Sequence, residues 1–361
     1  MFPVIMEALQ SKYRRLSKGS FLLEEDIESL EAYLVHQNWL PPDEGIRKIE
    51  KPGEGNMNLV LRVIPFKAAS FIVKQARPWV EKYPEIEAPI ERIKVEYSYY
   101  QYIMSSPILS RYSPGILGFD TENSLLVMED LGKATDFSFV YKNDFFFNQQ
   151  DLEAAINYLN NLKQLPIPAP YPSNLSLRKL NHQHIFYLPF STDNRFELDE
   201  IQPGLQQLSE SCKRDHYLIK IIDKLGKSYL ETGKFLVHGD FYPGSLLSSA
   251  EGLKVIDPEF SFVGPEEWDI AIFTAHLFLS NTPNGLIHNA LNMFHKTSDF
   301  DDNMFAGYLG TEILRRLLGL AQIPVEMDLR QKAQLIEQSI NWIKTGKIDT
   351  LSSYEHNCLS D

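Results

Sequence analysis

Residues 235–247 read FLVHGDFYPGSLL, and residues 253–260 read LKVIDPEF. In each stretch a short apolar strand leads to a carboxylate, Asp240 in the first and Asp257 in the second, with a tight hairpin between the two. A kinase catalytic loop needs one acid that orients the acceptor hydroxyl and further oxygen ligands that hold magnesium on the phosphates of ATP. Asp240 suits the first role, and Asp257 and Glu259 suit the second. In an extended chain Asp257 and Glu259 would point to the same side, and Mg²⁺ favours such hard oxygen ligands.

The His238-Gly239-Asp240 motif has a simpler reading as well. An isolated His-Gly-Asp is more often a turn in which Gly takes an unusual dihedral angle and Asp caps a backbone group. The pairing with Asp-Pro-Glu is much harder to attribute to chance. Together the two motifs resemble the aminoglycoside-phosphotransferase-like kinases, and residues 254–265 with residues 268–270 are similar to the methylthioribose kinases. Relatives in the wider superfamily usually place Asn where Ser245 stands and Asp where Glu259 stands.

A glycine-containing turn between two predicted strands is the first candidate for nucleotide binding. Glycines there would let backbone amides approach phosphate groups, although a plain hairpin turn explains them equally well. The resemblance to the methylthioribose kinases extends over residues 53–60 and implies nucleotide-binding roles for Gly53, Gly55, Asn56 and Asn58.

Lys74 lies inside an apolar strand and therefore needs a counter-charge, for which Glu96 on the following helix is the predicted partner. In a kinase such a lysine contacts the α- and β-phosphates, whereas on an edge strand it would reach water. Residues 127–131 end the last strand of this half and resemble the hinge of these kinases. The resemblance implies that backbone groups at Glu129 and Leu131 bind the adenine edge.

Arg315 and Arg316 are the candidate acceptor-binding residues. Neighbouring residues on a helix differ by about 100° in direction, so an arginine pair is ordinarily solvated or salt-bridged. The methylthioribose kinases carry a similar pair in a late helix, and the resemblance implies that both arginines bind sugar hydroxyls beside Asp240. Those kinases typically have Leu-His after the catalytic Asp, whereas this chain has Phe241-Tyr242 followed by Pro243.

Length and composition limit the remaining choices. At 361 residues the chain exceeds the usual size of a single core and predicts two lobes. Its 48 acidic and 35 basic residues leave a net charge of −13, which argues against a nucleic-acid or anionic-membrane partner. Cys212 and Cys358, the two cysteines, have no metal-ligand spacing, and the N-terminus lacks a basic region followed by a long apolar stretch. A cytoplasmic location is expected.

Hydrophobic periodicity predicts an α+β, two-lobed protein-kinase-like fold. An N-terminal nucleotide-binding lobe at 1–131 would hold an antiparallel sheet, and a mainly helical lobe at 132–361 would be catalytic and bind the acceptor. The N-terminal lobe should contain a helix within 22–40, strands at 46–50, 58–64, 71–76, 115–120 and 124–130, and a helix at 90–104. The C-terminal lobe should contain helices around 152–162 and at 215–232, 268–281, 284–296, 300–321 and 328–346, with mostly loop and short elements over 166–203.

These observations predict a kinase that depends on ATP and Mg²⁺ and phosphorylates a small-molecule acceptor, with methylthioribose and its anomeric hydroxyl implied by the resemblance. The resemblance also implies a homodimer. Two alternatives stay open: the same chemistry on another sugar, an amino alcohol or an aminoglycoside, and a non-catalytic nucleotide-binding protein of this fold. Intact Lys74, Asp240 and Asp257 argue against the second alternative.

Overall fold

The chain divides into two units, which are described separately. In this computed structural model the described residues are 2–17, 19–22, 26–53, 57–142, 145–167 and 170–349. The N-terminal unit comprises residues 1–134 and Pro258–Phe260. The C-terminal unit comprises Thr135–Asp257 and Ser261–Asp361. Within the described residues, no helix combines the length and apolar character that a membrane span requires.

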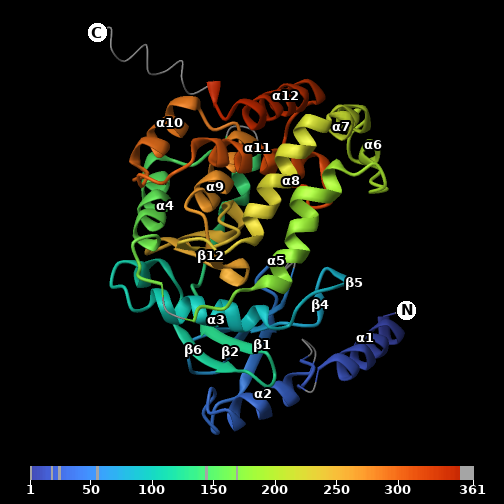
Figure 1. Ribbon diagram of the computed structural model, residues 1–361. Helices are drawn as coiled ribbons and strands as arrows, with labels where there is room; N and C mark the ends of the chain where they lie inside the picture. The colour runs from blue at the N-terminus through green and yellow to red at the C-terminus, as the bar shows by residue number, and fades with distance from the viewer. Residues whose placement is uncertain are drawn as a thin grey trace. The chain divides into compact units, whose positions relative to one another are not determined.

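An antiparallel sheet of five strands, in the order β1-β2-β3-β7-β6, forms the centre of the N-terminal unit (Figure 1). Its strands are β1 (Ile46–Glu50), β2 (Leu59–Pro65), β3 (Phe71–Gln75), β6 (Ile116–Asp120) and β7 (Leu125–Glu129). Each lies within one residue of its predicted position, because alternating or continuous apolar runs with β-branched residues, bounded by turn residues, mark the strands. The predicted α+β fold with an N-terminal antiparallel sheet is confirmed.

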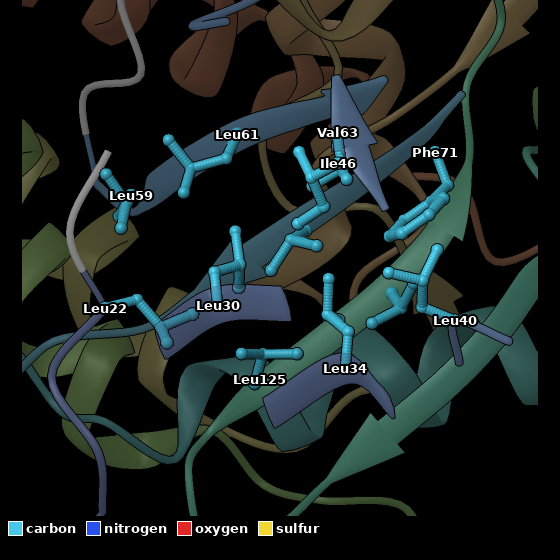
Figure 2. Close-up of a cluster of buried hydrophobic side chains, with 12 residues drawn as sticks. Leu22, Leu30, Leu34, Leu40, Ile46, Leu59, Leu61, Val63, Phe71 and Leu125 are labelled. Atoms are coloured by element: carbon cyan, nitrogen blue, oxygen red, sulfur yellow. The ribbon is translucent and has the colours of Figure 1, made fainter. Parts of the chain in front are cut away.

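Two helices pack on this sheet. α2 (Ile27–His36) begins where the Asp26 carboxylate accepts a hydrogen bond from Ser29 N at 3.1 Å, a typical N-cap. Its Leu30 and Leu34 face the same buried cluster as side chains of β2 and β7 (Figure 2). α3 (Arg92–Ile103) contacts β7 and the short 3-10 helix η6 (Pro258–Phe260). The N-terminal unit therefore includes two residues of the Asp-Pro-Glu motif, Pro258 and Glu259, together with Phe260.

Four elements among the described residues of this unit have no counterpart in the sequence-based prediction. They are α1 (Phe2–Leu16), β4 (Trp79–Val80), β5 (Tyr83–Glu87) and the 3-10 helix η1 (Leu109–Tyr112). β4 and β5 form a separate two-stranded sheet. β4 has only two residues, too few to produce a periodic pattern.

Helices dominate the C-terminal unit, as predicted. They are α4 (Gln149–Leu162), α5 (Leu175–His182), α6 (Leu198–Ile201), α7 (Leu205–Arg214), α8 (His216–Leu230), α9 (Glu267–Leu279), α10 (Asn284–Met293), α11 (Asp302–Leu318) and α12 (Leu329–Thr345). α11 packs against α8, α9 and α12, and every residue from Phe305 to Leu318 is buried. Charged side chains near the C-terminal end of α11 consequently lie inside the protein and need partners there.

Short strands and turns carry the predicted motifs of this unit. β9 (Phe235–Val237) pairs with β12 (Phe262–Gly264), and the hairpin β10 (Leu246–Ser249) and β11 (Gly252–Val255) is extended by β8 (Thr135–Asp136). The hairpin is thus formed by β10 and β11, the strand before Asp257, whereas β9, the strand before Asp240, pairs with β12. Residues 166–203 contain short elements as expected, including a π-helical turn at Gln183–Tyr187, but α7 just beyond them is an addition.

Candidate active site

The catalytic loop starts directly after β9. Gly239 has φ +89°, a conformation that side chains disfavour, and its carbonyl accepts a hydrogen bond from Trp268 Nε1 at 3.0 Å. Glycine is therefore required at the centre of the His-Gly-Asp motif. It turns the chain so that Asp240 follows the strand with its side chain only 23% exposed.

His238 and Asp269 hold the backbone of this loop in place through hydrogen bonds. The carboxylate of Asp269 accepts hydrogen bonds from the backbone N–H groups of His238 at 2.6 Å and Gly239 at 2.9 Å. His238 Nε2 lies 2.9 Å from the carbonyl of Ile256, which can only accept, so this nitrogen carries the proton and Nδ1 accepts the backbone N–H of Asp240 at 3.4 Å. His238 and Asp269 therefore fix the backbone of the catalytic loop.

Arg315 and Arg316 both face Asp240, although adjacent helical residues diverge by about 100°. Their Nη2 atoms lie 3.8 Å and 3.6 Å from Asp240 Oδ1. The side chains bend toward one point because both also bind Glu312. Tyr242 covers Arg316, with the guanidinium carbon 5.0 Å from the ring centroid. The structure thus brings together the three C-terminal residues that were assigned to catalysis and acceptor binding.

In the N-terminal unit, Lys74 of β3 forms the predicted ion pair with Glu96 of α3. Its Nζ lies 3.0 Å from Oε1 and 2.8 Å from Oε2 of Glu96, and both side chains are almost fully buried. The pair satisfies a charge that would otherwise be stranded inside an apolar sheet. Its function on the phosphates of ATP stays a prediction.

Arg92 was not identified as a site residue from the sequence. It binds two residues that were, Asn58 and Glu259. Its Nε donates to Asn58 Oδ1 at 2.9 Å and lies 3.2 Å from Glu259 Oε2, which also accepts Asn58 Nδ2 at 2.8 Å. The remaining guanidinium nitrogens donate to carbonyls of Met57, Arg77, Trp79 and Pro89. Arg92, Asn58 and Glu259 are called the Arg92 cluster below. One signal was available: Arg92 precedes Glu96 by four residues and so shares its face of α3.

The Asp257-Pro258-Glu259 segment is not extended, contrary to the expectation. Asp257 has φ +60°, and Pro258–Phe260 form the 3-10 helix η6. A left-handed non-glycine residue costs about 1–2 kcal/mol, and Asp tolerates it better than most residues. Across the described ranges no three His, Cys, Asp or Glu side chains gather to hold a metal ion. Mg²⁺ commonly takes only one or two carboxylates and completes its shell with phosphates and water, so two carboxylates are compatible with it.

The side chain of Asp130 holds the predicted hinge, residues 127–131, through hydrogen bonds. Its carboxylate accepts Arg62 Nη2 at 3.0 Å, Ser70 Oγ at 2.6 Å and the backbone N–H of Gly132 at 3.0 Å. Glu129 ends β7, where its backbone N–H donates to Gly115 O at 2.8 Å, and Leu131 follows Asp130. Asp130 thereby fixes the residues to which adenine contacts were assigned.

The glycine-containing turn is described only in part. Gly55 and Asn56 lie outside the described residues. At Gly53 an added Cβ would meet nothing within 4 Å, so no neighbouring protein atom requires a glycine there. The side chain of Asn58 is used within the Arg92 cluster.

The known proteins with similar sequences are phosphotransferases. Residues 49–302 match the phosphotransferase enzyme family. Methylthioribose kinase from Geobacillus sp. (strain WCH70) is 27% identical over 83% of this chain and 86% of its own length. The methylthioribose kinase from Exiguobacterium sibiricum is 26% identical over 82% of this chain and 86% of its own length.

Solved structures share the fold at low sequence identity. Choline kinase LicA from Streptococcus pneumoniae gives a TM-score of 0.50 at 12% identity, covering 91% of this chain and 100% of that chain. The AMP-bound spectinomycin phosphotransferase APH(9)-Ia gives 0.52 at 11% identity, covering 91% and 98%. At these identities the likeness shows the fold alone.

Proposed function

The chain belongs to the phosphotransferase enzyme family, and on that premise we propose that it uses ATP and Mg²⁺ to phosphorylate the anomeric hydroxyl of methylthioribose. The observation that carries the proposal is the convergence of Arg315 and Arg316 on Asp240. Two guanidinium groups offer planar sets of N–H donors beside a carboxylate that can accept a proton. A hydroxyl-rich acceptor needs donors and one base in this arrangement.

The charge of this group favours a neutral acceptor. Arg315 and Arg316 carry two positive charges, and Asp240 and Glu312 carry two negative ones, so the set is balanced. A choline or aminoglycoside acceptor carries a positive charge, for which this balanced set offers no excess negative charge. Methylthioribose is an uncharged polyol and needs none. The similarity to two methylthioribose kinases over more than four fifths of the chain supports the same acceptor.

Each proposed role follows from the chemistry of its residue. Asp240 orients the acceptor hydroxyl and accepts its proton, and Arg315 and Arg316 bind the sugar hydroxyls. Lys74, held by Glu96, contacts the phosphates, and the segment from Glu129 to Leu131 binds adenine through backbone groups. We assign nucleotide binding to residues 1–131 and catalysis with acceptor binding to residues 132–361.

Asp257 and Glu259 are the proposed ligands of magnesium. Both supply the hard carboxylate oxygens that this ion prefers. Asn58 and Arg92 bind Glu259 Oε2 and would orient the carboxylate, as hydrogen-bonding neighbours usually do for metal ligands. When bound, magnesium would neutralise charge on the phosphates of ATP.

Steady-state kinetics with each substrate varied in turn tests the acceptor assignment. Replacing Arg315 or Arg316 by Met removes charge-assisted hydrogen bonds worth roughly 1.5–3 kcal/mol, so KM for methylthioribose should rise about 10- to 150-fold. KM for ATP should stay nearly unchanged, and Lys should restore little because it lacks the planar fork. Arg214→Met is the control, since Arg214 is an exposed helical arginine in an ion pair with Glu210. Wild-type acceptor kinetics in both Met variants would remove the arginines from the site.

A further inference from the structure

The buried carboxylate of Glu312 lies behind the two acceptor-site arginines. It precedes Arg315 by three residues and Arg316 by four, so all three lie on one face of α11. Glu312 Oε1 accepts Arg315 Nη2 at 3.0 Å and Arg316 Nε at 2.7 Å, and Oε2 accepts Arg315 Nε. One carboxylate therefore holds both arginines through three hydrogen bonds.

A second set of contacts fixes Glu312 itself. His276 of α9 lies with Nε2 3.1 Å from Glu312 Oε1, and its Nδ1 lies 2.6 Å from the hydroxyl of Tyr141. A carboxylate can only accept, so Nε2 donates to Glu312 and Nδ1 accepts from Tyr141. Glu312 is thus held from α11 and α9, and through Tyr141 also from the 3-10 helix η2 (Phe137–Tyr141). Glu312, Arg315, Arg316, His276 and Tyr141 are called the Glu312 cluster below.

The charge state of this cluster is fixed by its surroundings. Burial lowers the pKa of His276 to about 4, so the imidazole is neutral at pH 7. Burial alone would raise the pKa of Glu312, but Arg315 and Arg316 outweigh it and hold that pKa well below its ordinary value. Glu312 is therefore a permanent anion with no exposed surface.

Glu312 is enclosed by protein atoms. Oε1 accepts hydrogen bonds from Arg315, Arg316 and His276, and Oε2 accepts one from Arg315. The side chain has no exposed surface through which a substrate could reach either oxygen. Glu312 is thus unsuited to bind a substrate hydroxyl, and its effect on the reaction must pass through the arginines.

We propose that Glu312 is the positioning residue of the acceptor site, which aims Arg315 and Arg316 together at Asp240. This inference rests on the proposed function, because it assumes that the arginines bind the acceptor. Two adjacent helical arginines leave the helix in directions about 100° apart, and the shared carboxylate of Glu312 holds both guanidinium groups toward Asp240. The alternative is that Glu312 only balances buried charge, in which case any carboxylate in its place would serve.

Glu312→Asp separates positioning from charge balance. Aspartate keeps the negative charge but is one methylene shorter, so it should pull both guanidinium groups away from Asp240. A misplacement of about 1 Å can cost roughly 100-fold in rate, so we expect kcat/KM for methylthioribose to fall about 10- to 100-fold. KM for ATP should not change. Wild-type acceptor kinetics in a folded Glu312→Asp variant would overturn the proposal.

Glu312→Gln provides a second variant with the size of glutamate and no charge. Combined with Arg316→Met, it shows whether Glu312 acts through the arginine: the double variant should lose less than the product of the two single effects. Fully multiplicative effects would overturn the proposal. Thermal unfolding of each variant is measured alongside, and Asp302→Asn, an exposed residue on the same helix, is the matched control.

Failure of this inference can be told from failure of the proposed function. If Arg315→Met and Arg316→Met raise the acceptor KM but Glu312→Asp does not, the proposed function stands and the positioning role falls. If none of the three substitutions alters acceptor kinetics, both fall. Tyr141→Phe gives a milder check, since loss of its hydroxyl leaves His276 Nδ1 without this donor and should raise the acceptor KM in the same direction.

Discussion

Asp240 lies three residues beyond β9, and its backbone N–H donates to His238. The backbone of its neighbour Gly239 is held by Asp269 and Trp268. Substitution by Asn keeps the size of the side chain and removes its ability to accept a proton. We expect Asp240→Asn to lower turnover by about 10²–10⁴-fold, the usual range for the loss of a general base. Affinity for ATP, followed by calorimetric titration, should be nearly intact. Unchanged turnover in the purified variant would exclude Asp240 from proton transfer.

His276 makes the stability of the C-terminal unit depend on pH. Its neighbours with charge or a titratable group are Tyr141, Tyr242, Glu312, Arg315 and Arg316. The pKa of His276 is about 4 in the folded protein against an ordinary value of 6.5, so the folded state binds fewer protons than the unfolded state between these values. The contribution of neutral His276 to the unfolding free energy is therefore fully present above pH 6.5 and is lost as the pH falls toward 4.

The variant His276→Gln isolates this effect, because glutamine keeps an N–H donor for Glu312 and does not titrate. Between pH 7 and pH 5 the wild-type protein should lose about 2 kcal/mol more unfolding free energy than the variant. Asp269 acts in the opposite direction, since burial raises its pKa to about 7, but it is common to both proteins. Urea unfolding at the two pH values provides the measurement. Equal losses in both proteins would mean that His276 is not neutral in the fold.

At the scale of elements, α3 connects two predicted motifs within the N-terminal unit. Glu96 binds Lys74 on β3, and Arg92, one turn earlier, binds Glu259 in η6. Breaking a buried ion pair by removing one partner typically costs 3–5 kcal/mol because the other charge is left alone. We expect Arg92→Met to lower the unfolding free energy by about this amount.

A double-mutant cycle checks this prediction against a simple packing defect. Glu259→Met in the Arg92→Met background replaces both charges by apolar groups, so the double variant should be more stable than the sum of the single effects predicts. Denaturant unfolding of the four proteins gives the coupling. Additive losses would show that Arg92 and Glu259 do not depend on each other.

Most elements with a clear period were predicted. Strands such as Leu59–Pro65 alternate buried and half-buried residues, and helices such as His216–Leu230 carry a continuous apolar face. The amphipathic helices α1 and α7 were nevertheless missed. β4 is too short to show a pattern, and Pro258–Phe260 looked extended because the left-handed turn at Asp257 has no sequence signature.

The same limit applies to side chains in the site. Lys74 could be identified because a charge within an apolar strand requires a partner, and Glu96 was one helix away. Arg92 was missed because Asn58 and Glu259, which it joins, are 201 residues apart in the chain. Glu312 was missed although its spacing to both arginines fits one helix face, because a Glu-Arg pair on a helix is ordinarily a solvated one. Glu312 is buried, which cannot be read from the sequence, so its ion pairs with the two arginines are not solvated.

At the scale of the molecule, each unit carries a separate part of the assigned chemistry. The N-terminal unit holds Lys74, Glu96 and Glu259, and the C-terminal unit holds Asp240, Asp257 and the arginine pair. The acceptor, the dependence on ATP and Mg²⁺, the homodimer and the cytoplasmic location stay predictions. The acceptor decides most about function, since the fold is shared by choline kinase and spectinomycin phosphotransferase structures.

The most direct measurement is a phosphorylation assay followed by phosphorus NMR. The purified protein is incubated with magnesium-ATP and, in separate reactions, methylthioribose, ribose, choline, ethanolamine and an aminoglycoside, with the Asp240→Asn variant as the control. We expect efficient turnover of methylthioribose alone, with the new phosphate on the anomeric hydroxyl and greatly reduced product in the variant. Turnover of choline, ethanolamine or the aminoglycoside without turnover of methylthioribose would contradict this expectation.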